Sequence, residues 1–129
     1  MKTTVVFLMI FLFAACAAAA DIYVISNQGL SITPDEVKDV FLGEKQFSGS
    51  ARLVPVDNAS VQEAALPKIL KMDAAKYNTY WTKKSFRDGV QPPPVKNSDA
   101  EVIAFVKNTP GGVGYVKSSP AGVKVVKKY

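Results

Sequence analysis

The sequence predicts an α/β fold, a single three-layer lobe with a mostly parallel sheet and helices on both faces of that sheet. Short apolar runs rich in β-branched residues alternate along the chain with longer segments that repeat apolar residues at helical spacing. Three of the helical segments open on a capping box, in which a serine or threonine is followed three residues later by glutamate. Strands that are separated by helices are joined by crossovers, which favours parallel pairing.

Residues 1–20 are typical of a secretory signal peptide, which leaves residues 21–129 as a single domain. Lys2 supplies a positive start, an unbroken apolar run covers residues 5–13, and small residues continue to Ala20. We therefore expect an exported, periplasmic protein. A retained anchor is the alternative, although the apolar run is short for a membrane span.

Cys16 has a second interpretation. The small residues before it approximate the box at which bacterial lipoproteins are cut and acylated, but Phe13 stands where that box usually has leucine. Lipidation would anchor the protein through Cys16. Simple cleavage would discard it and leave a chain without disulfide or thiol chemistry.

Charge and composition narrow the function classes. The chain carries 16 basic and 11 acidic residues, a net charge of +5, which suits a small anionic ligand or an anionic surface but also serves solubility. Export argues against a nucleic-acid partner. Histidine is absent, which removes Ser-His-Asp triads, histidine bases and nearly all zinc sites. We therefore expect no enzyme, no metal and no cofactor.

The first strand is expected in residues 21–26, a short apolar run that ends at a polar turn. A helix follows over residues 34–42. Thr33 and Glu36 form its capping box, and Pro34 takes the first helical position, where a missing N–H is harmless.

The second strand is expected in residues 51–58, where Pro55 is tolerable only at an edge or at a position without a ladder hydrogen bond. Ser60 opens the capping box of a helix over residues 61–70. Pro67 lies inside that helix and cannot donate a backbone hydrogen bond, so we expect a kink or a break there.

A longer helix is expected over residues 72–86, with Tyr77 and Trp81 four residues apart on its inward face. Three cations gather near the end of this helix, where they suit its dipole, and a solvated helix end is favoured over a binding role for them. They are Lys83, Lys84 and Arg87.

The remaining chain holds a proline-rich extended loop at residues 88–97, a capped helix over residues 99–107 and two strands at residues 113–116 and 123–126. The first of those strands begins among three glycines, at positions 111, 112 and 114. Either a turn needs positive φ there, or the backbone lies close to another segment. Nine residues are expected in the core: Val37, Phe41, Val54, Val56, Ile69, Trp81, Val102, Phe105 and Tyr115.

Two junctions between a strand and a helix are candidates for anion binding. Ligands of such sheets bind at the carboxyl ends of the strands, where helix N-termini expose N–H groups. Asn27 follows the first strand. Asn58 and Ser60 follow the second strand, which passes almost directly into a helix. The alternative is that Ser60 serves only as a helix cap.

Four segments resemble the phosphate-type periplasmic solute-binding proteins of ABC transporters. ITPDEVKDVFLGEKQF is similar to their helix-and-turn segment, and RLVPVDN is similar to the strand that comes next. ILKMDAAKYNTYWTKKSF is similar to the helical segment that follows, and DAEVIAFVKNTPGGVGYV is similar to their ending. The resemblance covers most of residues 31–117 in the right order, and it implies one lobe of a type 2 periplasmic binding protein.

The resemblance also implies roles for particular residues. The three glycines would serve a tight turn and close packing, with Tyr115 packed inward. The family holds its oxyanion with an arginine and a Ser-Gly-Thr sequence. Here Asn58 stands about where the arginine would be, and asparagine cannot supply the bidentate geometry of a guanidinium. Ala59, Ser60 and Val61 replace Ser-Gly-Thr.

We therefore expect an exported, non-enzymatic solute-binding-like protein, related to the substrate-binding proteins of phosphate ABC transporters. It would bind phosphate or another small oxyanion at a helix N-terminus and have an ABC permease or another envelope protein as partner. The alternative is a single-lobe accessory or interaction module of the envelope that has lost ligand binding. The missing arginine and the length of one lobe favour that alternative. The apolar surface that would meet a second lobe favours a homodimer.

Overall fold

The computed structural model describes residues 21–118 and 120–129. The expected signal peptide and Cys16 therefore lie outside the described residues. Among the described residues, the buried members of both hydrophobic cores lie between Ile22 and Val116. No helix in the described part of the chain is long and apolar enough to cross a membrane.

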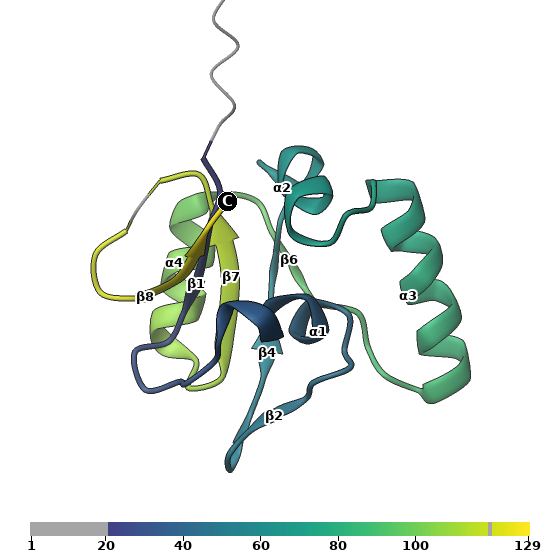
Figure 1. The fold of residues 1–129 in the computed structure, drawn as a ribbon, viewed down its shortest axis with the longest axis horizontal. Helices are drawn as coiled ribbons and strands as arrows, with labels where there is room; N and C mark the ends of the chain where they lie inside the picture. Colours follow the sequence, from purple (N-terminus) through teal and green to yellow (C-terminus); the bar gives the residue numbers. More distant parts are fainter. Residues whose placement is uncertain (1–20, 119) are drawn as a thin grey trace, which may run out of the picture.

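The central sheet contains four strands, which are β1 (Tyr23–Ser26), β4 (Val54–Pro55), β7 (Gly112–Val116) and β8 (Lys124–Lys128). Their order across the sheet is β4-β7-β1-β8 (Figure 1). β4 runs parallel to β7. β1 lies between β7 and β8 and runs antiparallel to both. The sheet is therefore mixed.

The predicted α/β class is confirmed, but the expectation of a mostly parallel sheet is wrong. The helical connection after β1 leads to β4, which is not a neighbour of β1 in the sheet. The crossover rule concerns strands that a helix joins within one sheet, so it does not set the direction of β1 against β7 and β8.

Parallel pairing does occur where a helical crossover joins neighbouring strands. β5 (Asp57–Asn58) continues the line of β4 after Val56, and it pairs in parallel with β6 (Val95–Lys96). The N–H of Val56 donates to the carbonyl of Val113 at 2.8 Å. The chain from β4 to β5 therefore lies between β7 and β6.

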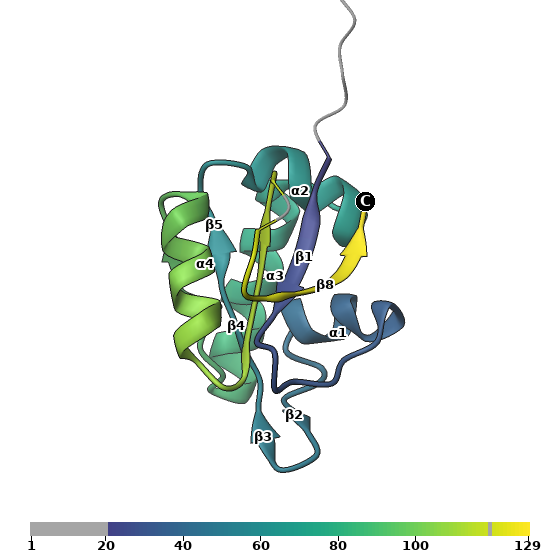
Figure 2. The ribbon, with the colours of Figure 1, turned by 90° about the vertical axis from the view of Figure 1, so that its left-hand side faces the viewer.

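The start of the second predicted strand belongs to a separate hairpin. β2 (Phe47–Ser48) and β3 (Ala51–Arg52) pair antiparallel, with Phe47 directly opposite Arg52. The hairpin extends away from the body of the molecule (Figure 2).

The described residues form four α-helices, which are α1 (Val37–Phe41), α2 (Gln62–Ile69), α3 (Ala74–Asp88) and α4 (Asp99–Asn108). The 3-10 turn η1 (Pro34–Glu36) leads into α1, so the first predicted helix is present but begins with a tighter turn.

Two of the three predicted helix caps form. Glu36 accepts from the N–H of Thr33 at 3.0 Å, which is one half of the capping box at η1. Ser98 caps α4 by accepting from the N–H of Glu101 at 3.3 Å. Pro67 lies inside α2, and the helix ends at Ile69. Local side-chain chemistry therefore positions the starts of η1 and α4.

Helices cover both faces of the sheet, as predicted (Figure 2). α4 lies on one face, where Val102 and Val106 pack with Ile25 and Val56 in the smaller core. α1, α2 and α3 supply eight of the 17 buried residues of the larger core on the other face. Seven of the nine predicted core residues are buried: Val37, Phe41, Val56, Ile69, Trp81, Val102 and Tyr115.

The other two predicted core residues, Val54 and Phe105, are only partly buried. Val54 lies beside a cavity rather than under a helix. Phe105 packs against the smaller core only in part, and the Nζ of Lys96 lies 5.3 Å from its ring centroid. The helical period places Phe105 near the apolar stripe, but the width of the buried face depends on the sheet beneath it.

The glycines around β7 permit close approach of other segments. A Cβ at Gly111 would lie 1.7 Å from the carbonyl oxygen of Arg52, and a Cβ at Gly114 would lie 2.6 Å from Cγ1 of Val102. Neither glycine has positive φ. The reason for these glycines is therefore the contact with a neighbouring backbone and helix, as the resemblance implied, and not a left-handed turn.

Candidate ligand site

Asn58 is fully buried, and its hydrogen-bonding capacity is used within the protein. Its Nδ2 donates to Oδ1 of Asp99 at 2.7 Å and to the carbonyl of Tyr115 at 3.0 Å. Its Oδ1 accepts from both the N–H and the hydroxyl of Ser60. A primary amide has two N–H donors and one oxygen with two lone pairs. The side chain of Asn58 therefore holds β5, β7 and α4 together and has no group left for a ligand.

The turn that follows Asn58 also satisfies its own donors. The N–H of Ala59 donates to the carbonyl of Lys96 at 2.8 Å, and the N–H of Val61 donates to the carbonyl of Asn58 at 3.2 Å. The N-cap position of α2 is Val61, without a side-chain hydrogen bond. The predicted capping box of Ser60 is therefore wrong, because Asn58 takes both donors of Ser60 in an Asx turn.

Asn27 lies at the other end of the fold. Its Nδ2 donates to the carbonyls of Val106 and Lys107 at 3.0 and 3.1 Å, at the last turn of α4. Asn58 contacts Asp99 at the first residue of the same helix. A helix of this length spans about 14 Å, so the two asparagines do not share a site. The cause is the antiparallel direction of β1, which places its carboxyl end at the opposite edge of the sheet.

The structure instead identifies Asp57, which the sequence analysis missed. Its side chain is buried, with Oδ2 accepting from the hydroxyl of Tyr77 at 2.7 Å and Oδ1 from the hydroxyl of Tyr115 at 2.8 Å. Burial raises the pKa of Asp57, while the hydrogen bonds from the two tyrosines and Gln62 oppose that rise. Burial and the nearby Asp57 carboxylate raise the pKa of both tyrosines, so both stay protonated and act as donors.

A cavity of about 600 Å³ lies beside Asp57, between α3, the first residue of α2 and the proline-rich segment that leads to β6. We call it the Asp57 cavity. Three of its polar side chains come from exposed and half-buried positions of α3. Besides Asp57, the polar side chains are Gln62, Asn78, Thr82, Ser85 and Gln91.

Two buried polar atoms in the lining of this cavity have no hydrogen-bond partner among the described residues: Nε1 of Trp81 and Oγ of Ser85. The Trp81 side chain is only 5% exposed. Its N–H lies close enough to the hydroxyl of Tyr77 to lower the pKa of that hydroxyl, but it does not reach hydrogen-bond geometry. A buried donor without an acceptor costs about 1–3 kcal/mol. Each of the two atoms has less than 1 Å² of accessible surface, so a solute in the cavity would gain them as partners only after neighbouring side chains move.

The cations at the end of α3 do not belong to this cavity. Lys83 and Arg87 are exposed, as expected for a solvated helix end. Lys84 departs from that expectation, because it is buried and its Nζ lies 3.4 Å from Glu44 and 3.5 Å from Asp88. This ion pair ties α3 to the loop after α1. The sequence did not reveal it because Glu44 is 40 positions away in the chain.

Comparison with known proteins finds a similar fold among solved structures. No family model matches the sequence, and no curated protein matches it either. Among solved structures, the chain is similar to an ABC-type phosphate transport receptor from Vibrio cholerae, with a TM-score of 0.54 and 15% sequence identity. The match covers 84% of this chain and 47% of the receptor, so the chain spans about half the receptor's length.

The similarity confirms the predicted kind of α/β lobe at the level of the fold. The architecture is that of a lobe in a transport receptor, with a mixed sheet between two layers of helices. In the turn from Asn58 to Val61, where the resemblance places the family's oxyanion site, the donors are directed to the protein itself.

Proposed function

We propose that the protein is an exported, non-enzymatic solute-binding protein that holds phosphate or another small oxyanion in the Asp57 cavity. The observation that carries the proposal is the pair of unpartnered buried donors, Nε1–H of Trp81 and Oγ–H of Ser85, in residues that line the Asp57 cavity. The amide of Gln62, at the first residue of α2, lies in the same wall. A receptor-type fold supports the same class of function.

The donors of this cavity favour a particular protonation state of the ligand. Trp81, Ser85 and Gln62 offer neutral N–H and O–H groups, which bind oxyanion oxygens without adding positive charge. Asp57 accepts hydrogen bonds when ionised and would repel a fully deprotonated oxyanion. An oxyanion that keeps a proton can donate to Asp57. We therefore propose that hydrogen-bearing phosphate binds better than sulfate, and better in mildly acidic than in mildly alkaline solution.

Calorimetry on the Asp21–Tyr129 chain tests this function. Phosphate is titrated in low salt without phosphate buffer, with sulfate as the comparison. We expect binding heat with phosphate that is strongly reduced in Ser85→Ala and in Trp81→Phe. Ser50→Ala, at the exposed tip of the hairpin, is the matched control and should bind as the native protein does. Absence of heat in a folded native chain would contradict the proposal.

The same titration separates the cavity from the turn that the sequence analysis favoured. Ser60 lies in the turn before α2 and is not part of the cavity lining. Ser60→Ala should therefore leave the phosphate affinity unchanged. If Ser60→Ala removes the heat and Ser85→Ala does not, the oxyanion binds at the turn from Asn58 to Val61.

A second candidate function is a single-lobe accessory or interaction module of the envelope without a solute. The observation that favours it is the internal use of every donor in the turn after Asn58, together with a length about half that of the receptor. Its partners would be an ABC permease, another envelope protein or a second copy of the chain. A folded chain that gives no heat with phosphate or sulfate and sediments as a dimer would favour this function.

A further inference from the structure

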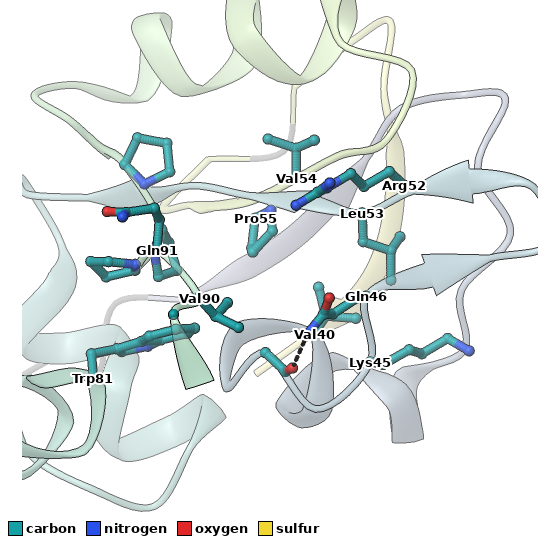
Figure 3. A pocket seen from close by; sticks show the side chains of 15 residues that line it. Val40, Lys45, Gln46, Arg52, Leu53, Val54, Pro55, Trp81, Val90 and Gln91 are labelled. Atoms are coloured by element: carbon teal, nitrogen blue, oxygen red, sulfur yellow. Dashed lines mark hydrogen bonds between the residues drawn. The ribbon is translucent and has the colours of Figure 1, made fainter. Parts of the chain in front are cut away.

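A second cavity, of about 330 Å³, shares Trp81, Gln91, Pro92 and Pro93 with the lining of the Asp57 cavity (Figure 3). Helix α1 and the strand residues before β5 form one wall, and the end of α3 with the proline-rich segment forms the other. We call it the Arg52 cavity. Its walls are mainly apolar, and the side chains that matter for the argument are Val40, Leu53, Pro55, Trp81 and Val90.

Trp81 lines both cavities and presents a different edge to each. A Cβ at Gly43 would lie 2.7 Å from Cη2 of Trp81, so the benzene edge of the indole faces Gly43, a residue of the Arg52 cavity. The N–H lies near Tyr77, which belongs to the Asp57 cavity. The Arg52 cavity therefore receives the apolar edge of the indole, while the polar edge belongs to the site already described.

Arg52 places a positive charge at the mouth of the apolar cavity. Its side chain extends over the cavity toward Pro55 (Figure 3). Among the described residues it makes no ion pair and no side-chain hydrogen bond. The other lining cation, Lys45, points away from the cavity and is paired with Glu36 at 2.8 Å. The charge available to a ligand here is therefore that of one guanidinium.

We propose that the Arg52 cavity binds a small organic monocarboxylate with a compact apolar body. The guanidinium of Arg52 would take the carboxylate in bidentate fashion, which its planar fork suits. Val40, Leu53, Val90 and the benzene edge of Trp81 would cover the apolar body. An inorganic oxyanion has no apolar part to fill such walls, so this ligand class differs from the one proposed for the Asp57 cavity. The volume lies within the range of small-molecule sites.

Calorimetric titration of the Asp21–Tyr129 chain with benzoate tests this inference. Benzyl alcohol keeps the ring without the charge, and acetate keeps the charge without the ring. We expect benzoate to bind, and both comparison compounds to bind at least about tenfold more weakly. Equal affinity for acetate and benzoate would overturn the proposal, as would the absence of benzoate binding to a folded chain.

Two variants with different effects on the site sharpen the test. Arg52→Gln should weaken benzoate binding by about tenfold or more, the loss expected for a charged hydrogen-bond pair. Lys38→Gln, on the exposed side of α1, removes the same charge and should change nothing. Val90→Phe fills the cavity without changing charge and should abolish benzoate binding. Unchanged benzoate affinity in Arg52→Gln would contradict the assignment.

The benzoate test can fail or succeed whether or not phosphate binds in the Asp57 cavity. Arg52→Gln and Val90→Phe leave the donors of the Asp57 cavity in place, so phosphate heat should persist in both variants. Ser85→Ala should likewise leave benzoate binding intact, because Ser85 does not line the Arg52 cavity. Failure of benzoate to bind therefore counts only against the inference about Arg52.

Discussion

The hydroxyl of Tyr77 donates to Oδ2 of Asp57 at 2.7 Å, from the fourth residue of α3 to the first residue of β5. This contact joins the helix that supplies five of the eleven residues lining the Asp57 cavity to the strand that carries the buried carboxylate. Tyr115 makes the matching bond to Oδ1 from β7. The position of α3 over the cavity thus depends on a buried carboxylate whose oxygens are both occupied.

Tyr77→Phe is expected to destabilise the protein by about 1–3 kcal/mol, because it leaves one oxygen of a buried carboxylate without its donor. Urea unfolding measures the change in the free energy of unfolding. Tyr129→Phe is the matched control, since the hydroxyl of Tyr129 has no hydrogen bond in the described part of the chain. A loss in Tyr77→Phe no larger than that in the control would contradict the role given to the contact.

The titration of Asp57 should make stability depend on pH. Its folded-state pKa is raised above the ordinary 3.8, mainly by burial. The stabilising contribution of such a group is complete below the unfolded pKa and is lost as pH rises through the folded pKa. Asp57→Asn does not titrate, so the unfolding free energy of the native protein minus that of the variant should fall above pH 3.8. Urea unfolding over a pH series measures it, and a difference that rises with pH would refute the assignment.

The titration of Glu36 should change stability with pH in the direction opposite to that of Asp57. Its hydrogen bonds with Lys45 and Thr33 lower its pKa from 4.5 to about 2. A lowered pKa gives stability that is present above the unfolded value and is lost as pH falls through the folded value. Glu36→Gln should therefore lose stability relative to the native protein above pH 4.5 and converge with it toward pH 2. Urea unfolding over the same pH series measures the difference, and a loss of stability that stays constant down to pH 2 would contradict the assignment.

Gly114→Ala should destabilise the protein by about 1–3 kcal/mol, the usual cost of overpacking a core. The new Cβ would lie 2.6 Å from Cγ1 of Val102 and 3.0 Å from Cγ1 of Val56, so α4 would have to move. Val102→Ala removes the nearer methyl group. In the double variant the two changes should cost less than the sum of the single changes, and thermal unfolding of all four proteins measures the coupling. If the free-energy losses of the two single variants simply add in the double variant, the new Cβ is accommodated by a movement that does not involve Val102.

Features set by neighbouring residues could be predicted from the sequence. The cap at Thr33, the cap at Ser98 and the inward pair Tyr77 and Trp81 depend on contacts within one or two turns of chain. The cap at Ser60 failed for a local reason that competes with capping. The N–H and the hydroxyl of Ser60 both donate to the side-chain oxygen of Asn58, two residues earlier. The Ser60 side chain is therefore engaged in a turn and does not cap the helix.

Features that depend on distant segments could not be predicted. The direction of β1 is set by β7 and β8, which lie about 90 positions later in the chain and are not joined to it by a crossover. Asp57 looks like an ordinary polar residue at a strand end, and only the fold shows that Tyr77 and Tyr115 enclose it. Apolar periodicity places Trp81 inside the protein, but it does not show that its N–H lacks an acceptor.

The most direct test of the central claim uses the fact that the chain contains one tryptophan. The ¹⁵N-labelled Asp21–Tyr129 chain gives a single indole N–H cross-peak, which reports on Nε1 of Trp81. If phosphate binds in the Asp57 cavity, this peak should move downfield to a saturating position as the N–H gains an acceptor. An unmoved indole peak, while the amide peaks of Ser60 and Val61 shift with phosphate, would contradict the account.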